Sequence, residues 1–251
     1  MGLNLIPNLR NACAVLRLLG SSKEGLSQAE IEGQLKLPRA TTYRILTTLT
    51  LEGMSRKVGS KYFIGHAMAQ FALKAMSSLS IQEIGKPVLE ELANQVGETA
   101  HIAVPSGPQS LIVGVHDSPN PIRVASQAGS LADIHCSSTG KLFLADLSEE
   151  ELDHILSTLT LNSRTPKTLV TAKALKAELD KVREQNYAID EEEYFQDVRC
   201  LAAPIREASN KVIAAIGITG TSSRFSQARN EEVRLIVQSA AKKIESQLMG
   251  G

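Results

Sequence analysis

Two short segments in the second half of the chain carry most of the side chains that could do chemistry. They are HCSSTGK, residues 135–141, and AIDEEEYFQDVRC, residues 188–200. His135, Asp190 and Cys200 are the residue types of a nucleophilic site, in which an oriented imidazole activates a thiol. Cys136 and Cys200 could instead form a redox sensor. The sequence does not show whether these residues lie close together, so both readings stay open as alternatives.

The serine- and threonine-rich part of the first segment also suggests anion binding. Ser138, Thr139 and Gly140 stand at the N-terminus of a short helix predicted over residues 140–146. Free backbone N–H groups and the positive end of the helix dipole hold a carboxylate well at such a position. The alternative is a turn that only caps the helix.

A different chemistry is indicated by LPRATTYRILTTLTLEGMSRK, residues 37–57. The spacing predicts a helix that begins near Pro38, ends at Gly53 and buries a thin stripe of Thr42, Ile45, Leu46 and Leu49. Arginine can bridge two acceptors of guanine in the major groove, and threonine can contact a base edge. The candidate base-reading residues, which face outward or border the stripe, are Arg39, Thr41, Tyr43, Arg44 and Thr47.

The elements around this helix favour DNA binding over a solvated basic face. Ser27 and Glu30 have capping-box spacing, which predicts a preceding helix whose start, at Ser27 and Gln28, can meet a phosphate. A hairpin is predicted around Gly59, and its Arg56, Lys57 and Lys61 can contact the DNA backbone. This order predicts a winged helix-turn-helix that binds double-stranded DNA.

Charge and composition agree with a two-part protein. Residues 1–75 hold ten basic and four acidic side chains, a net charge of +6, whereas the remaining residues carry −6. No apolar run is long enough to span a membrane. The three cysteines are scattered, so we expect reduced thiols, a cytoplasmic location, and neither a metal nor a cofactor. Because catalysis would leave the basic part unexplained, we expect that the protein is not an enzyme.

The domain boundaries follow from a change in periodicity. We expect a DNA-binding domain over residues 1–65, a connecting helix over 66–79 and a second domain over 80–251. Within the second domain, residues 99–105, 110–117, 122–128, 199–207 and 211–220 read as strands between amphipathic helices. Hairpin-connected strands flanked by helices predict an α+β fold. The helical stripe of Met68, Phe71 and Ala75 is the expected dimer seam of the first domain.

The chain resembles the IclR-type bacterial transcriptional regulators. The resemblance is carried by GLSQAEIEGQLKLPRATTYRILTTLTLEG, IHCSSTGKLFLADLSEEEL, NYAIDEEEYFQDVRCLAAPI and AAIGITGTSSR, in the same order. It implies a GAF-like effector-binding domain, and dimers or tetramers that bind palindromic operators. It also places Asp190, Val198 and Cys200 at effector-contacting positions.

Two further positions set the expected ligand apart from that of relatives. Gly217 and Thr219 stand where such regulators commonly have two serines, so we expect more room and one fewer hydroxyl at Gly217. The resulting hypothesis is a small organic acid, with its carboxylate at Ser138–Gly140 and Val124 on its apolar side. The identity of the acid, the operator, the sign of regulation and the choice between dimer and tetramer stay open.

Overall fold

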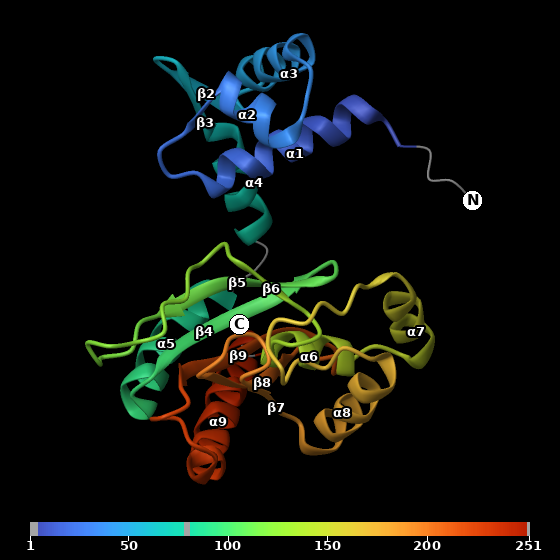
Figure 1. Ribbon diagram of the computed structural model, residues 1–251. Helices are drawn as coiled ribbons and strands as arrows, with labels where there is room; N and C mark the ends of the chain where they lie inside the picture. Colours follow the sequence, from blue (N-terminus) through green and yellow to red (C-terminus); the bar gives the residue numbers. More distant parts are fainter. Residues whose placement is uncertain (1–4, 78–80, 250–251) are drawn as a thin grey trace. The chain divides into compact units, whose positions relative to one another are not determined.

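The computed structural model describes residues 5–77 and 81–249, and the chain divides into two compact units, residues 1–79 and 80–251. The first unit holds α1 (Pro7–Ser21), α2 (Gln28–Leu35), α3 (Arg39–Leu51) and α4 (His66–Ser77). Its small antiparallel sheet has the order β1-β3-β2, formed by Leu26–Ser27, Lys61–Ile64 and Ser55–Val58. Figure 1 shows the strands β2 and β3 as a hairpin beside α2 and α3.

Local signals account for this unit. The capping box of Ser27 and Glu30 is formed at the start of α2, as predicted. The left-handed Lys36 ends α2, and Pro38 caps α3. The buried residues of α3 are the four of the predicted stripe, and Ile45, Leu46 and Leu49 share one core with Val15, Leu19 and Ile31. The helix-turn-helix and its wing therefore form as the sequence predicts.

Helix α4 occupies most of the predicted connecting segment. Phe71 is 56% exposed, whereas Met68 is partly buried. The side chain of Ala75, the third residue of the predicted dimer seam, and residues 78–80 lie outside the described residues. Within the described parts of the chain, no helix is long and apolar enough to cross a membrane.

The second unit is built on a six-stranded sheet in which every neighbouring pair is antiparallel. The strand order is β6-β5-β4-β9-β8-β7. The bounds are Thr99–Ser106 for β4, Gln109–His116 for β5, Leu131–Asp133 for β6, Ala188–Glu191 for β7, Val198–Arg206 for β8 and Val212–Thr221 for β9.

Helices cover both faces of this sheet (Figure 1). Helix α5 (Ile81–Val96) packs with α9 (Asn230–Met249) on one face, where Gly85 lies against Ile102 and Ile244. Helices α6 (Ser138–Ala145), α7 (Glu149–Thr158) and α8 (Ala172–Gln185) build an aliphatic core on the other face. A short 3-10 turn, Gln227–Arg229, precedes α9. The unit is α+β, as predicted.

One predicted element is wrong. Residues 122–128 form no strand, and the edge strand β6 lies at Leu131–Asp133 instead. The acidic run at residues 190–193 belongs to the sheet and its surroundings: Asp190 and Glu191 lie on β7, and Asp190 and Glu193 are buried. Strand β7 pairs with β8, so Glu191 faces Arg199, whose guanidinium donates to both carboxylate oxygens at 2.7 and 2.6 Å.

Candidate functional site

The second unit contains a cavity of about 340 Å³ between the sheet, the start of α6 and the loop that precedes β6. Seven of the nine predicted ligand-binding residues line it, and Gly140 and Gly217 do not. Its walls are mixed, with apolar side chains such as Ile112, Leu131 and Phe195 beside polar ones. The predicted residues that line it are Val124, Ser138, Thr139, Asp190, Val198, Cys200 and Thr219.

A row of polar side chains crosses four strands of the sheet, and all of its members except Thr99 line the cavity. Thr99 on β4 pairs with Thr219 on β9, Thr219 pairs with Cys200 on β8, and Cys200 pairs with Asp190 on β7. The Cys200 thiol donates to the Thr219 hydroxyl at 3.1 Å. Because directly paired residues of antiparallel strands point to the same face, the sheet register gathers residues that are up to 120 positions apart in the chain.

The helix start at the cavity differs in detail from the prediction. Helix α6 begins at Ser138 and not at residue 140, and Ser137 caps it: its Oγ accepts the Gly140 N–H at 3.2 Å. Gly140 therefore offers no free donor, and a Cβ at this position would meet the carbonyl oxygen of Ile134 at 2.3 Å. The first-turn N–H groups left without an intrahelical partner belong to Ser138 and Thr139. The Thr139 hydroxyl also bonds the Ser110 hydroxyl at 2.7 Å.

The extra room predicted at Gly217 is absent. A Cβ there would meet the Leu201 carbonyl oxygen at 2.5 Å and the Ala202 Cβ at 2.9 Å, so the glycine permits close packing within the sheet. Opposite Gly217 on β4 stands His101, a cavity residue that the sequence analysis missed. Its Nδ1 is buried and has no hydrogen-bond partner in the described structure. Burial lowers the pKa of His101 to about 4, so the ring is neutral at pH 7. A lone histidine in the apolar run TAHIAVP was the available signal.

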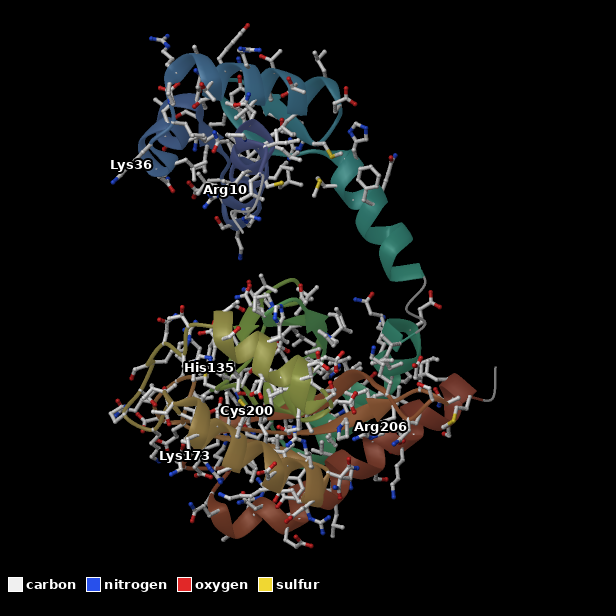
Figure 2. All side chains as sticks on the ribbon, turned by 90° about the vertical axis from the view of Figure 1, so that its right-hand side faces the viewer. Arg10, Lys36, His135, Lys173, Cys200 and Arg206 are labelled. Carbon is white, nitrogen blue, oxygen red and sulfur yellow. The ribbon has the colours of Figure 1, made fainter. Side chains whose placement is uncertain are left out.

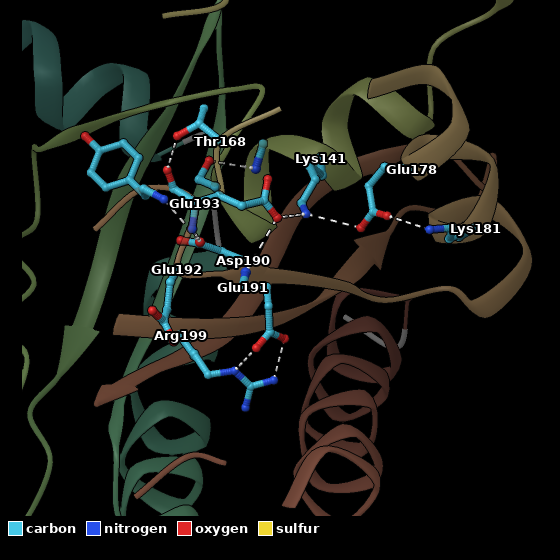
Figure 3. A network of polar contacts seen from close by, with 12 residues as sticks. Lys141, Thr168, Glu178, Lys181, Asp190, Glu191, Glu192, Glu193 and Arg199 are labelled. Atoms are coloured by element: carbon cyan, nitrogen blue, oxygen red, sulfur yellow. Dashed lines mark hydrogen bonds and ion pairs between the residues drawn. The ribbon is translucent and has the colours of Figure 1, made fainter. Parts of the chain in front are cut away.

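A buried charge network lies behind Asp190 (Figure 3). The Asp190 Oδ1 accepts the N–H groups of Glu193 and Tyr194 at 2.7 and 3.2 Å. Lys141 is fully buried and donates to Glu193 at 2.6 Å and to Glu178 at 3.2 Å. Burial, reinforced by the charge of Glu193, raises the pKa of Asp190 to about 7. The cavity therefore holds a carboxyl group that changes charge near neutral pH.

The structure does not bring His135 and Cys200 together as the enzyme alternative requires. His135 lines a separate cavity, and its Nε2 lies 3.1 Å from the Asn162 carbonyl oxygen, while Cys200 pairs with Asp190. Figure 2 labels His135 and Cys200 among the side chains of the second unit. Burial raises the pKa of the Cys200 thiol well above its usual range and that of Cys136 to about 12. Since the thiolate is the reactive form, neither cysteine is primed as a nucleophile or a redox sensor.

The first unit presents a basic helix and wing. Arg39, Tyr43, Arg44 and Thr47 on α3 are exposed, and Thr41 is half-buried. Thr41 and Arg44 also line a hollow between α3 and α1 of about 330 Å³. The hydroxyls of Thr42, Thr48 and Thr50 bond carbonyls of the preceding turn, which leaves Thr41 and Thr47 as the threonines of α3 without such a bond.

The basic side chains of the wing make contacts within the first unit, unlike the exposed side chains of α3. The Arg56 guanidinium stacks over the Phe63 ring at 4.6 Å and the Lys57 ammonium lies 5.3 Å from the Tyr62 ring centre, while both side chains stay exposed. Lys61 donates to the Glu24 carbonyl at 3.3 Å.

At α2, both the N–H and the hydroxyl of Ser27 donate to Glu30. The Gln28 amide donates to Glu32 and to the Arg39 carbonyl oxygen. At this helix start, backbone N–H groups of the first turn are better placed for a phosphate than the Ser27 side chain.

Family models match both units. Residues 9–59 match the IclR helix-turn-helix domain, and residues 73–246 match the bacterial transcriptional regulator IclR C-terminal domain. The chain belongs to the IclR family of bacterial transcriptional regulators. As an IclR-family protein, it has an N-terminal DNA-binding domain and a C-terminal effector domain.

Curated relatives and solved structures span almost the whole IclR-family chain. It is 32% identical to the transcriptional repressor IclR of Escherichia coli, over 95% of this chain and 89% of the relative. A transcriptional regulator from Rhodococcus is 26% identical with a TM-score of 0.80, over 98% of this chain and 99% of the other. An IclR homologue from Microbacterium hydrocarbonoxydans, complexed with 4-hydroxybenzoate, has the same fold, with a TM-score of 0.83, 22% identity, and coverage of 97% and 100%.

Proposed function

We propose that this IclR-family protein is a cytoplasmic repressor, not an enzyme, which binds a palindromic operator as a dimer or tetramer and releases it on binding a small organic acid. The observation that carries the effector part is the cavity in which the start of α6, the Thr219–Cys200–Asp190 row and the neutral His101 converge. Repression is supported by the names of relatives, which include the repressors IclR and AllR.

The chemistry of the cavity defines the ligand. None of its lining residues is a lysine or an arginine, so a carboxylate depends on the N–H groups of Ser138 and Thr139 at the positive end of α6. Val124 and Val198 contact the apolar body of the acid, and Cys200 and Thr219 contact its middle. Asp190 and His101 bond a hydroxyl on the ligand. The acid bound by the Microbacterium homologue, 4-hydroxybenzoate, has this combination of groups and is a suitable first probe.

The DNA contacts divide by role. Arg44, with Arg39, Thr41, Tyr43 and Thr47, enters the major groove, because these residues share the side of α3 that faces away from its core. Arg56, Lys57 and Lys61 on the wing, and the start of α2 at Ser27 and Gln28, meet phosphates. One winged helix reads only a few base pairs, so two copies related by a twofold axis are needed for a palindrome.

Calorimetry with a panel of organic acids, combined with protection of the gene's own promoter, tests this function. We expect one acid to bind the wild type and to weaken promoter protection. Thr139→Pro and Asp190→Ala should each lower the affinity for that acid, whereas changes at exposed sites outside the cavity, Thr158→Val and Asp180→Ala, should leave it unchanged. Equal binding by the wild type and both cavity variants would place the effector elsewhere, and unaltered promoter protection would refute effector control.

A further inference from the structure

The turn between β6 and α6 gathers three side chains with metal-binding chemistry, and none of them lines the effector cavity. Asp133, His135 and Cys136 each offer one ligand atom, and these atoms all lie within 4.8 Å of one another. The turn is closed at Asp133, whose carbonyl oxygen accepts the N–H and the hydroxyl of Ser137 at 3.2 and 2.8 Å. The fold thus holds a carboxylate, an imidazole and a thiol together within four consecutive residues.

The hydrogen bond at Nε2 of His135 indicates that Nδ1 is the ring nitrogen available to a ligand. Its Nε2 lies 3.1 Å from the Asn162 carbonyl oxygen, which can only accept, so Nε2 carries the proton. The lone pair of Nδ1 is therefore available. This atom is buried and has no hydrogen-bond partner among the residues that the structure describes. Metal-bound histidines characteristically donate their second ring N–H to a carbonyl or carboxylate in this way.

Charged groups surround the three side chains. Cys136 is fully buried, and the carboxylates of Asp133, Asp190 and Glu193 act on its thiol together with the guanidinium of Arg164. Two of these carboxylates are paired, Asp133 with Arg164 at 2.6 Å and Glu193 with Lys141 at 2.6 Å. A divalent ion at this place would meet the oriented carboxylate of Asp133 and an unpartnered imidazole lone pair.

We propose that Asp133, His135 and Cys136 bind one divalent ion of the zinc class. A nitrogen, sulfur and oxygen donor set with three protein ligands suits Zn²⁺ and leaves one position open, whereas a thiolate disfavours Mg²⁺ and Ca²⁺. On binding, the Cys136 sulfur loses its proton to solvent and coordinates as the thiolate. Asp133 and His135 line a cavity of about 610 Å³ that also contains His154, which provides a route of entry.

The ion would require a small contraction of the site. Ligand atoms of a tetrahedral zinc centre lie about 3.3–3.5 Å apart, so separations of up to 4.8 Å must close by up to about 1.5 Å. Asp133 is only partly buried and ends an edge strand, so its carboxylate can move when it leaves the ion pair with Arg164. The bound ion would fix the turn that leads into the start of α6. This proposal does not depend on the proposed effector.

Cobalt spectroscopy of the full-length, metal-free protein tests the site. We expect one equivalent of Co²⁺ to give tetrahedral visible bands and a near-ultraviolet thiolate-to-cobalt band, both abolished by one equivalent of Zn²⁺. Cys136→Ser should lose the thiolate band. Cys13→Ser, at an exposed cysteine of α1, and Cys200→Ser, at the effector cavity, should keep it.

Cys136→Ser changes a buried residue and could fail to fold, so a second variant is needed. Asp133→Asn changes a partly exposed side chain, and it should weaken Co²⁺ binding at least tenfold. Absence of a thiolate band in the wild type with excess Co²⁺ would overturn the proposal. So would persistence of the band in Cys136→Ser, or binding of several equivalents that Asp133→Asn does not affect, which would indicate surface binding.

Discussion

Raising the pH from 6 to 9 should weaken binding of the acid effector, and Asp190 should be the reason. Asp190 shares the cavity with the α6 start at which we place the ligand carboxylate. Its pKa is raised to about 7, first by burial and then by repulsion from Glu193. Below pH 7 the carboxyl is mostly neutral and tolerates an anion nearby, whereas above pH 7 it is ionised and repels it.

Two estimates of the size of this effect agree. If only the neutral carboxyl admits the ligand, affinity falls about tenfold per pH unit above 7, and thus about 100-fold by pH 9, or about 2.7 kcal/mol. Two like charges roughly 6 Å apart at an effective dielectric constant of about 20 repel each other by about 2.8 kcal/mol. The neutral ring of His101, with its pKa of about 4, does not titrate in this range.

Calorimetric titration at half-unit pH intervals measures the effect, with the acid chosen so that it is ionised throughout. Asp190→Asn mimics the neutral carboxyl, so its affinity should be nearly flat from pH 6 to 9. Asp180→Asn, at an exposed residue of α8, should reproduce the wild-type slope. A wild-type affinity that is flat, or that rises with pH, would refute the reasoning, and so would a slope that survives in Asp190→Asn.

Four further outcomes are expected. Arg44→Ala should weaken specific DNA binding by about 1–3 kcal/mol and relax sequence preference at one position per half-site in competition binding; an unchanged preference would contradict a base contact. Lys57→Ala should instead weaken binding to all sequences alike and reduce the salt slope by about 1, as followed by anisotropy at several salt concentrations. Light scattering at micromolar concentration should show an even-numbered oligomer, and a monomer would disprove this. Lys141→Met should lower the free energy of unfolding by about 3–5 kcal/mol in urea titrations because it leaves Glu193 buried without its partner, and Lys141→Met/Glu193→Gln should recover part of that loss.

The DNA-binding unit was predictable because its signals are local. The capping box of Ser27 and Glu30 spans one helical turn, and the buried stripe of α3 is set by the 3.6-residue period alone. The two strands of the wing are joined by a two-residue turn, so their pairing needs no knowledge of distant residues. The division between a basic and an acidic part could likewise be counted from the sequence.

The cavity was predictable only in part. Ser138, Thr139, Asp190 and Cys200 were recognised by residue type and by resemblance, and they do line one cavity. The cap at Ser137 was missed because helix α6 begins two residues before the predicted start, and the local pattern fixes helix ends poorly.

The sequence by itself determined which residues form the helix-turn-helix, because neighbours along the chain decide helical periodicity, capping and tight turns. The tertiary structure alone decided that Thr99, Thr219, Cys200 and Asp190 stand in one row, and that His101 faces Gly217. It also decided that Lys141 meets Glu193, 52 positions away. The physical reason is that a strand's alternation fixes which face a side chain takes, whereas its partners depend on the register between distant strands, where a shift of one residue would reverse every face.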